Sequence, residues 1–153
     1  MKKFLLPAML SALVLLAGCT TVSSPSSVDA ETSATAQMLP LSPHVTVRAG
    51  TDPDGEILLS SATMEGFFAS DHYTDESPYG FALVLTGEGK KQFRVATREL
   101  ANDQSPVTLW AGDEAICSPV ITTSINTKYV ILNISSVKDA ESYDYVVNAL
   151  QTA

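Results

Sequence analysis

The sequence is poor in the residues on which most enzymes depend. It contains 2 histidines and 2 cysteines among 153 residues, so few side chains could act as a general base near neutral pH. It has no Gly-x-Ser-x-Gly elbow, no glycine-rich phosphate loop and no His-Glu-x-x-His helix. Gly87-Glu88-Gly89 follows an apolar run but lacks the third glycine of a dinucleotide-binding turn. We therefore expect a protein that is not an enzyme and that binds no cofactor and no small-molecule substrate.

Basic residues are also scarce. Nine Lys and Arg residues stand against 17 Asp and Glu residues, which gives a formal net charge of −8 at pH 7. A strongly acidic chain repels nucleic acids and anionic lipid headgroups. We therefore exclude nucleic-acid binding and expect basic or neutral protein partners.

One histidine stands among carboxylates, an arrangement that could hold a metal ion. Asp71, His72, Asp75 and Glu76 offer oxygen ligands and one imidazole to a divalent ion. No second histidine is near, and the spacing matches no known metal-binding loop. A solvated acidic loop is the preferred interpretation, and we expect no metal.

Residues 1–18 form a predicted secretory signal peptide. Lys2 and Lys3 precede an apolar run, Phe4 to Leu16, that is too short to span a bilayer comfortably. The run ends in Leu16-Ala17-Gly18-Cys19, which resembles the lipobox of bacterial lipoproteins. This resemblance implies that acyl chains such as palmitate on Cys19 anchor the protein to a membrane. Because Thr20 rather than an aspartate follows, it also implies the outer membrane, with the protein facing the periplasm; a cleaved signal with a chance cysteine is the alternative.

Residues 19–43 are predicted to be a disordered linker, and residues 44–153 one globular domain. The linker is rich in Ser, Thr, Ala and Pro and has too little apolar surface to offset the entropy of ordering. A flexible tether is favoured over a partner-binding tail. Loss of Lys2 and Lys3 with the signal leaves seven basic residues against 17 acidic ones, a net charge of −10. With Cys19 lipidated, Cys117 is alone and is expected to be a small buried hydrophobe.

Residues 79–121 predict a strand, a helix and a hairpin. Tyr79 to Thr86 is an apolar run of strand length, and Gly87 to Leu100 carries apolar residues at the spacing of one helix face. Thr86 is placed to cap this helix. Val107 to Ala111 and Ile116 to Ile121 then predict two strands joined at Gly112-Asp113. These elements would form one βαββ unit.

The flanking segments complete an α+β expectation. His44 to Arg48 and Ile57 to Leu59 predict a hairpin, whereas the polarity of residues 64–78 predicts a loop. Tyr129 to Ile134 predicts a strand, and Ser136 with Asp139 approximates a capping box before a final helix. We expect a small domain with one mixed or antiparallel sheet and two helices on one of its faces, in the order βαββ-βα.

Several of these motifs resemble the head region of the first periplasmic domain of SecD. The matching positions are Leu85 to Lys90, Phe93, Thr97 and Cys117 to Ile121, with looser matches at Val47 to Thr51 and Ile134 to Ala140. The resemblance covers roughly residues 44–150 and implies a polypeptide-handling module related to protein export through the Sec translocon. Two features depart from the SecD pattern. The transmembrane helices of SecD have no counterpart here, so no proton-driven work is expected. Asn126-Thr127-Lys128 also replaces a glycine pair before the later strand.

Two classes of function follow. In the first, the domain binds extended polypeptide by adding it to a sheet edge. We nominate the hairpin Val107 to Ile121, with Trp110, Ser118, Pro119 and Val120 as candidate contacts, although core packing is the plainer interpretation of Trp110. In the second, the protein is an anchored inhibitor or immunity-type lipoprotein whose acidic surface covers one basic protein. Broad, weak binding would favour the first class and one tight partner the second. A purely structural role in the envelope is a third possibility.

Overall fold

The computed structural model describes residues 37–71, 78–134 and 136–153. The predicted signal peptide, Cys19 and most of the predicted linker lie outside these residues. The elements, in chain order, are β1 (Val45–Ala49), β2 (Ile57–Ser60), the 3-10 turn η3 (Ser61–Thr63), β3 (Met64–Ser70), β4 (Gly80–Leu85), α2 (Gly87–Asp103), β5 (Val107–Ala111), β6 (Glu114–Cys117), β7 (Tyr129–Asn133) and α3 (Ala140–Thr152). Across the described ranges, no helix is both long and apolar enough to cross a membrane.

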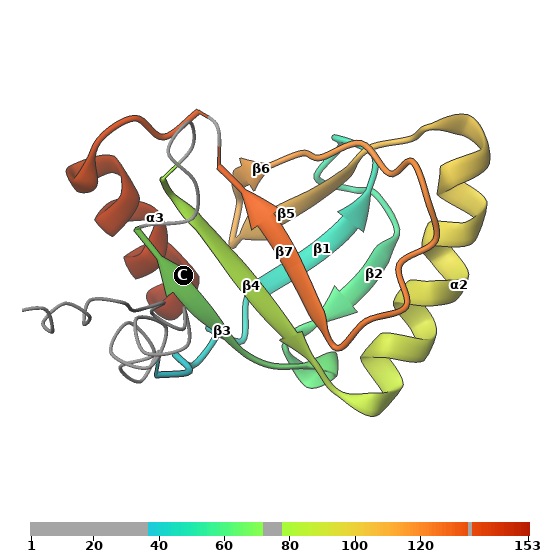
Figure 1. Cartoon of the computed structure of the whole chain (residues 1–153), viewed down its shortest axis with the longest axis horizontal. Helices are drawn as coiled ribbons and strands as arrows, with labels where there is room; N and C mark the ends of the chain where they lie inside the picture. Colours follow the sequence, from blue (N-terminus) through green and yellow to red (C-terminus); the bar gives the residue numbers. More distant parts are fainter. Residues whose placement is uncertain (1–36, 72–77, 135) are drawn as a thin grey trace, which may run out of the picture. The chain divides into compact units, whose positions relative to one another are not determined.

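The α+β class and the antiparallel pairing are confirmed, but the strands form two sheets rather than the predicted one. A four-stranded sheet has the order β2-β1-β5-β6, and a three-stranded sheet has the order β3-β4-β7. Figure 1 shows the three-stranded sheet lying in front of the four-stranded one. Side chains from both sheets join one hydrophobic core, which includes Val45, Leu109, Phe81 and Leu132. This core holds the two sheets together through apolar burial.

The predicted βαββ unit is divided between the sheets. β4 pairs with β3 and β7, whereas β5 pairs with β1 and β6, so the helix α2 connects one sheet to the other. The two helices were predicted to cover one face of a single sheet, and this is wrong. α2 runs beside β2, and α3 lies on the opposite side of the view in Figure 1. α3 reaches both sheets: the Tyr143 hydroxyl donates to the Gly80 carbonyl of β4 at 2.9 Å, and the Tyr145 hydroxyl donates to Glu114 of β6 at 2.7 Å.

The prediction of a loop over residues 64–78 is wrong for the first half of this segment, because β3 occupies Met64–Ser70. Phe67 is fully buried and packs edge-on against Phe81, with ring centroids 6.3 Å apart. The pairing of β3 with β4 shifts register between Met64 and Gly66. This irregularity breaks the alternation of period two by which a half-buried strand is recognised.

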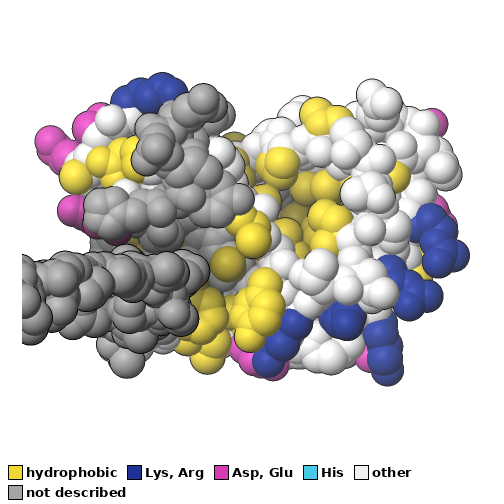
Figure 2. All heavy atoms as spheres, viewed as in Figure 1, with side chains coloured by type: hydrophobic (Ala, Val, Ile, Leu, Met, Phe, Trp, Pro, Cys, Tyr) yellow, Lys and Arg dark blue, Asp and Glu magenta, His cyan; other side chains and the backbone are white. Residues whose placement is uncertain are grey.

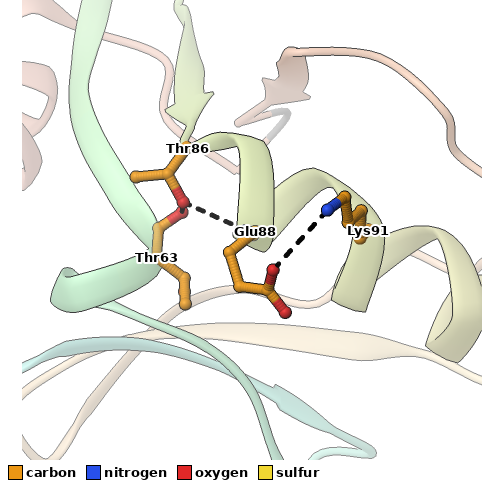
Figure 3. Close-up of polar contacts among 5 residues, drawn as sticks. Thr63, Thr86, Glu88 and Lys91 are labelled. Atoms are coloured by element: carbon orange, nitrogen blue, oxygen red, sulfur yellow. Dashed lines mark hydrogen bonds and ion pairs between the residues drawn. The ribbon is translucent and has the colours of Figure 1, made fainter.

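The predicted cap of α2 is confirmed. Thr86 is the N-cap residue, and its hydroxyl accepts the Gly89 N–H at 3.0 Å. The Thr86 hydroxyl and backbone N–H both lie within hydrogen-bond distance of the Thr63 carbonyl, at 3.2 and 3.0 Å (Figure 3). Glu88 and Lys91 form an exposed ion pair one turn further, at 4.0 Å. The start of α2 is therefore fastened to η3, which lies between β2 and β3.

The last helix is capped by a different residue than predicted, and residues before His44 pack on the domain. α3 begins at Ala140 with Asp139 as its N-cap, whose carboxylate accepts the Ser142 N–H at 2.8 Å, so Ser136 is not the cap. At the other end, Leu39 bridges to Phe67 of β3, and the Ser42 N–H donates to the Leu150 carbonyl at 2.8 Å. The domain thus includes residues that the sequence assigned to the linker before His44.

A candidate binding groove

An apolar groove opens between β7 and the segment that follows β6. It has a volume of about 180 Å³, and Figure 2 shows it as a hollow with hydrophobic side chains. Its floor and walls come from both sheets and from α2, and they include Val47, Leu83, Phe93, Leu109, Val130 and Leu132. Pro119, Val120, Ile125 and Ile131 also line it. A dry apolar cavity of about 150 Å³ holds one benzene-sized group, so this groove has room for one large apolar side chain.

Residues 118–128, which we call the frame, form the wall opposite β7. The frame is first bonded to the entry of β5, where the Val107 N–H donates to the Pro119 carbonyl at 2.9 Å and the Ile121 N–H donates to Ser105 at 3.0 Å. It is next bonded to α2, because the Ser124 hydroxyl donates to the Arg94 carbonyl at 3.1 Å. These bonds to two separate elements fix the position of the frame relative to β5 and α2.

Thr97 joins the frame to the floor of the groove. Its fully buried hydroxyl donates to the Phe93 carbonyl at 2.7 Å and accepts the Ile125 N–H at 2.9 Å. Both hydrogen-bonding roles of the hydroxyl are thereby used, as a buried polar group requires. The Phe–Thr pair noted in the sequence therefore has a structural role: Phe93 contacts the groove and Thr97 positions Ile125.

β7 forms one edge of the three-stranded sheet. In its antiparallel pairing with β4, the Leu85 N–H donates to the Lys128 carbonyl at 2.8 Å and the Ile134 N–H to the Tyr79 carbonyl at 3.3 Å. Hydrogen-bonded pairs alternate along such a ladder, so Val130 and Leu132 direct their backbone groups at β4. Ile131 stands opposite Ala82 in a non-hydrogen-bonded pair. The N–H and C=O of Ile131 therefore point away from the sheet, at the border of the groove.

The outward backbone groups of Tyr129, the first residue of β7, are not available to pair with another strand. The Thr127 hydroxyl accepts the Tyr129 N–H at 3.0 Å and also donates to the Tyr129 carbonyl. One side chain thus satisfies both outward backbone groups of Tyr129. The open part of the edge begins at Ile131.

The four predicted contact residues lie in different places. Pro119 and Val120 line the groove, and Val120 is 55% exposed. Ser118 is exposed, its hydroxyl lies 2.9 Å from that of Thr108, and it lines a shallow hollow beyond the other end of β7 together with Pro119. Trp110 is buried on the face of β5 opposite Leu109 and does not line the groove. Among the described residues, the indole N–H of Trp110 has no hydrogen-bond partner.

Sequence reasoning missed Ile131 and Tyr129, which are 57% and 51% exposed. The strand that contains both residues was predicted, but neither residue was proposed as a contact. The available signal was the apolar character of both faces of that strand. Such a strand is either covered on both sides or exposes an apolar face, and β7 does the latter.

The cysteine and the potential metal ligands considered in the sequence do not contribute to the groove. Cys117 is partly rather than fully buried, which differs from the prediction. This partial burial raises the pKa of its thiol to about 12, so the reactive thiolate is absent near neutral pH. His72, Asp75 and Glu76 of the metal hypothesis lie outside the described residues. Within the described part of the chain, no three His, Cys, Asp or Glu residues gather closely enough to hold a metal ion.

Comparison with known proteins yields a likeness of fold. No protein-family model matches the chain, and no curated protein does. Among solved structures, it is similar to SecDF, described as a membrane component that enhances protein export, with a TM-score of 0.52. The match has 17% sequence identity and covers 86% of this chain and 70% of that one. The chain described here therefore has a SecD-like fold.

Proposed function

We propose that this domain binds extended polypeptide at the β7 edge. The observation that supports this most directly is the position of Ile131, whose outward N–H and C=O border an apolar groove. A peptide lying along β7 would exchange backbone hydrogen bonds with Ile131. Alternate side chains of a strand point to opposite faces, so one apolar side chain of the peptide would enter the groove.

The geometry favours broad, weak binding over tight recognition of one partner. Backbone pairing carries little sequence information, and a groove for one apolar side chain discriminates only modestly. The frame is already bonded in place, so little ordering cost accompanies binding. These properties suit a module that handles many unfolded chains and performs no chemistry on them.

The proposed setting is protein export. SecDF, which shares the fold, is described as enhancing protein export. We propose an accessory of that process, non-enzymatic and without cofactor, in the periplasm. The anchored-inhibitor alternative would gain support if affinity purification from a periplasmic extract yielded one folded basic protein in high yield rather than many unfolded precursors.

The variant Ile131→Pro tests the proposed binding edge. Proline removes the outward N–H while leaving the ladder with β4 intact, because Ile131 does not donate to β4. We expect the affinity for a short peptide of alternating valine and threonine to fall about ten-fold, the value of one good hydrogen bond. The measurement is fluorescence anisotropy with a neutral fluorophore on the peptide and the full chain in phosphatidylcholine nanodiscs.

The matched control is Ile131→Val, which keeps the N–H and should bind like the parent. Circular dichroism would establish that both variants are folded. Undiminished peptide binding by a folded Ile131→Pro protein would place the binding surface elsewhere and contradict the proposal.

We also propose that the protein is a lipoprotein of the outer membrane, anchored by acyl chains on Cys19. Acylation of Cys19 can be tested separately from peptide binding. Bacteria expressing the full chain are grown with radiolabelled palmitate, and the purified protein is examined for label. We expect the parent and Cys117→Ser to be labelled and Cys19→Ser to be unlabelled, since the lipobox resemblance assigns acylation to Cys19 alone. Label retained in Cys19→Ser would refute the anchor.

A further inference from the structure

A stripe of basic side chains runs along α2 beside the frame. Lys90, Arg94 and Arg98 are spaced four residues apart, which puts them on one side of the helix. This basic stripe adjoins the side that carries Phe93 and Thr97, and the Arg94 carbonyl itself accepts the Ser124 hydroxyl of the frame. Lys and Arg side chains gather on the α2 side of the face in Figure 2 that contains the groove.

The basic stripe is not neutralised by the acidic residues of α2. Glu88 and Glu99 lie on another side of the helix, where they line a hollow next to β2, and Lys91 pairs with Glu88 there. The ion pairs found among the described residues include none with Lys90, Arg94 or Arg98. Arg94 and Arg98 are exposed, and Lys90 is half-buried. The stripe thus keeps its positive charge toward solvent in a chain whose net charge is −8.

Acidic residues gather at the other end of the domain. The β5–β6 turn and the first turns of α3 contribute five carboxylates, at Asp113, Glu114, Asp139, Glu141 and Asp144. The residues that line the groove carry no charge. Lys128, at the end of the frame, is paired with Glu65 at 2.9 Å and so adds no net charge. The unpaired charge beside the groove is that of the basic stripe, and it is opposite in sign to the charge of the whole chain.

We propose that the preferred occupant of the groove is an extended, apolar polypeptide segment that carries an Asp or Glu residue on the side facing α2. The apolar side chain fills the groove, the backbone pairs with Ile131, and the carboxylate lies within the field of the basic stripe. This inference rests on the proposed polypeptide binding and adds a charge preference to it. That preference is the reverse of the one that net charge alone predicts.

The test compares three peptides of alternating valine and threonine that end in glutamate, glutamine or lysine, each with a neutral fluorophore. Binding is measured by anisotropy on the full chain in phosphatidylcholine nanodiscs. We expect the order glutamate, glutamine, lysine, with a spread of roughly three- to ten-fold, because exposed charge pairs contribute little individually. The spread should collapse in about 0.5 M sodium chloride, where screening acts within a few ångströms.

Charge-matched variants identify the source of the preference. Arg94→Gln should bring the three affinities closer together, while Lys138→Gln, which also removes one positive charge but at the α3 end, should preserve the spread and the order. Equal affinities for all three peptides on the parent would overturn the charge preference and leave polypeptide binding standing. Failure of every peptide to bind would overturn both proposals. Preference for the lysine peptide would show that net charge governs binding and would refute the role of the stripe.

Discussion

Gly89→Ala is expected to lower the free energy of unfolding by about 3 kcal/mol, as overpacking at a close backbone contact does. A Cβ atom on Gly89 would lie 2.1 Å from the Thr63 carbonyl oxygen and 3.1 Å from its carbonyl carbon. These are backbone atoms, so no side chain can turn aside to make room. The helix start would have to move away from η3, which would strain the bonds between Thr86 and Thr63.

Gly87 provides a control two residues earlier on the same helix. No atom lies within 4 Å of the position a Cβ would take there. Gly87→Ala should therefore leave stability unchanged or raise it by up to about 1 kcal/mol, since alanine is the better helix former. Urea unfolding followed by circular dichroism measures both variants. Equal stability of the two alanine variants would mean that α2 does not approach η3 as described.

Phe93→Ala is expected to cost about 4 kcal/mol of unfolding free energy. The ring is 1% exposed and contributes to the core where the two sheets and α2 meet. Its loss removes apolar burial and enlarges the groove. The hydrogen bonds that fix the frame oppose its movement into the space left by the ring. Where the surroundings cannot relax, most of the cavity remains, and the loss of unfolding free energy is at the large end of the range for such substitutions.

Val95→Ala is the matched control for Phe93→Ala, because it truncates an apolar side chain of α2 that is 60% exposed. We expect its free energy of unfolding, measured by urea denaturation, to lie within a few tenths of a kcal/mol of that of the parent. A loss below about 1 kcal/mol for Phe93→Ala would show that the groove floor closes on truncation, and the groove would then be far less rigid than its bonds indicate.

The elements that could be predicted from the sequence are those whose signals are local. Thr86 precedes a glycine-rich first turn and caps α2 as expected, and the spacing of Phe93 and Thr97 places both on the buried side of the helix. The β1–β2 and β5–β6 hairpins also follow from turn residues between apolar runs. In each case the deciding residues lie within a few positions of one another.

Strand partners could not be predicted in the same way. The run now seen as β4 was expected to share a sheet with β5 because α2 joins them, yet β4 lies between β3 and β7. Its burial on both sides fits a central strand but does not say of which sheet. The decisive neighbour, β3, was hidden by its register shift at Gly66. An error of one strand therefore changed the number of sheets.

The candidate site was predicted in part. Proline in the Pro119-Val120 segment indicated an irregular, accessible edge, and both residues do line the groove. Trp110 lies on the other side of β5, since neighbouring residues of a strand face opposite ways. Ile131 could not have been chosen without the pairing of β7 with β4, because only that register decides which backbone groups remain outside the ladder.

The Thr127 hydroxyl also bears on the solubility of the protein. Exposed strand edges with apolar side chains are templates for aggregation, and Tyr129 and Ile131 would present such an edge. By bonding both outward groups of Tyr129, Thr127 shortens the run of backbone that another copy could join. Fibril-forming segments are commonly six or seven residues long, more than the open part of β7 offers. The same edge can thus bind a short peptide segment, yet it is too short to support a continuous sheet between copies of the protein.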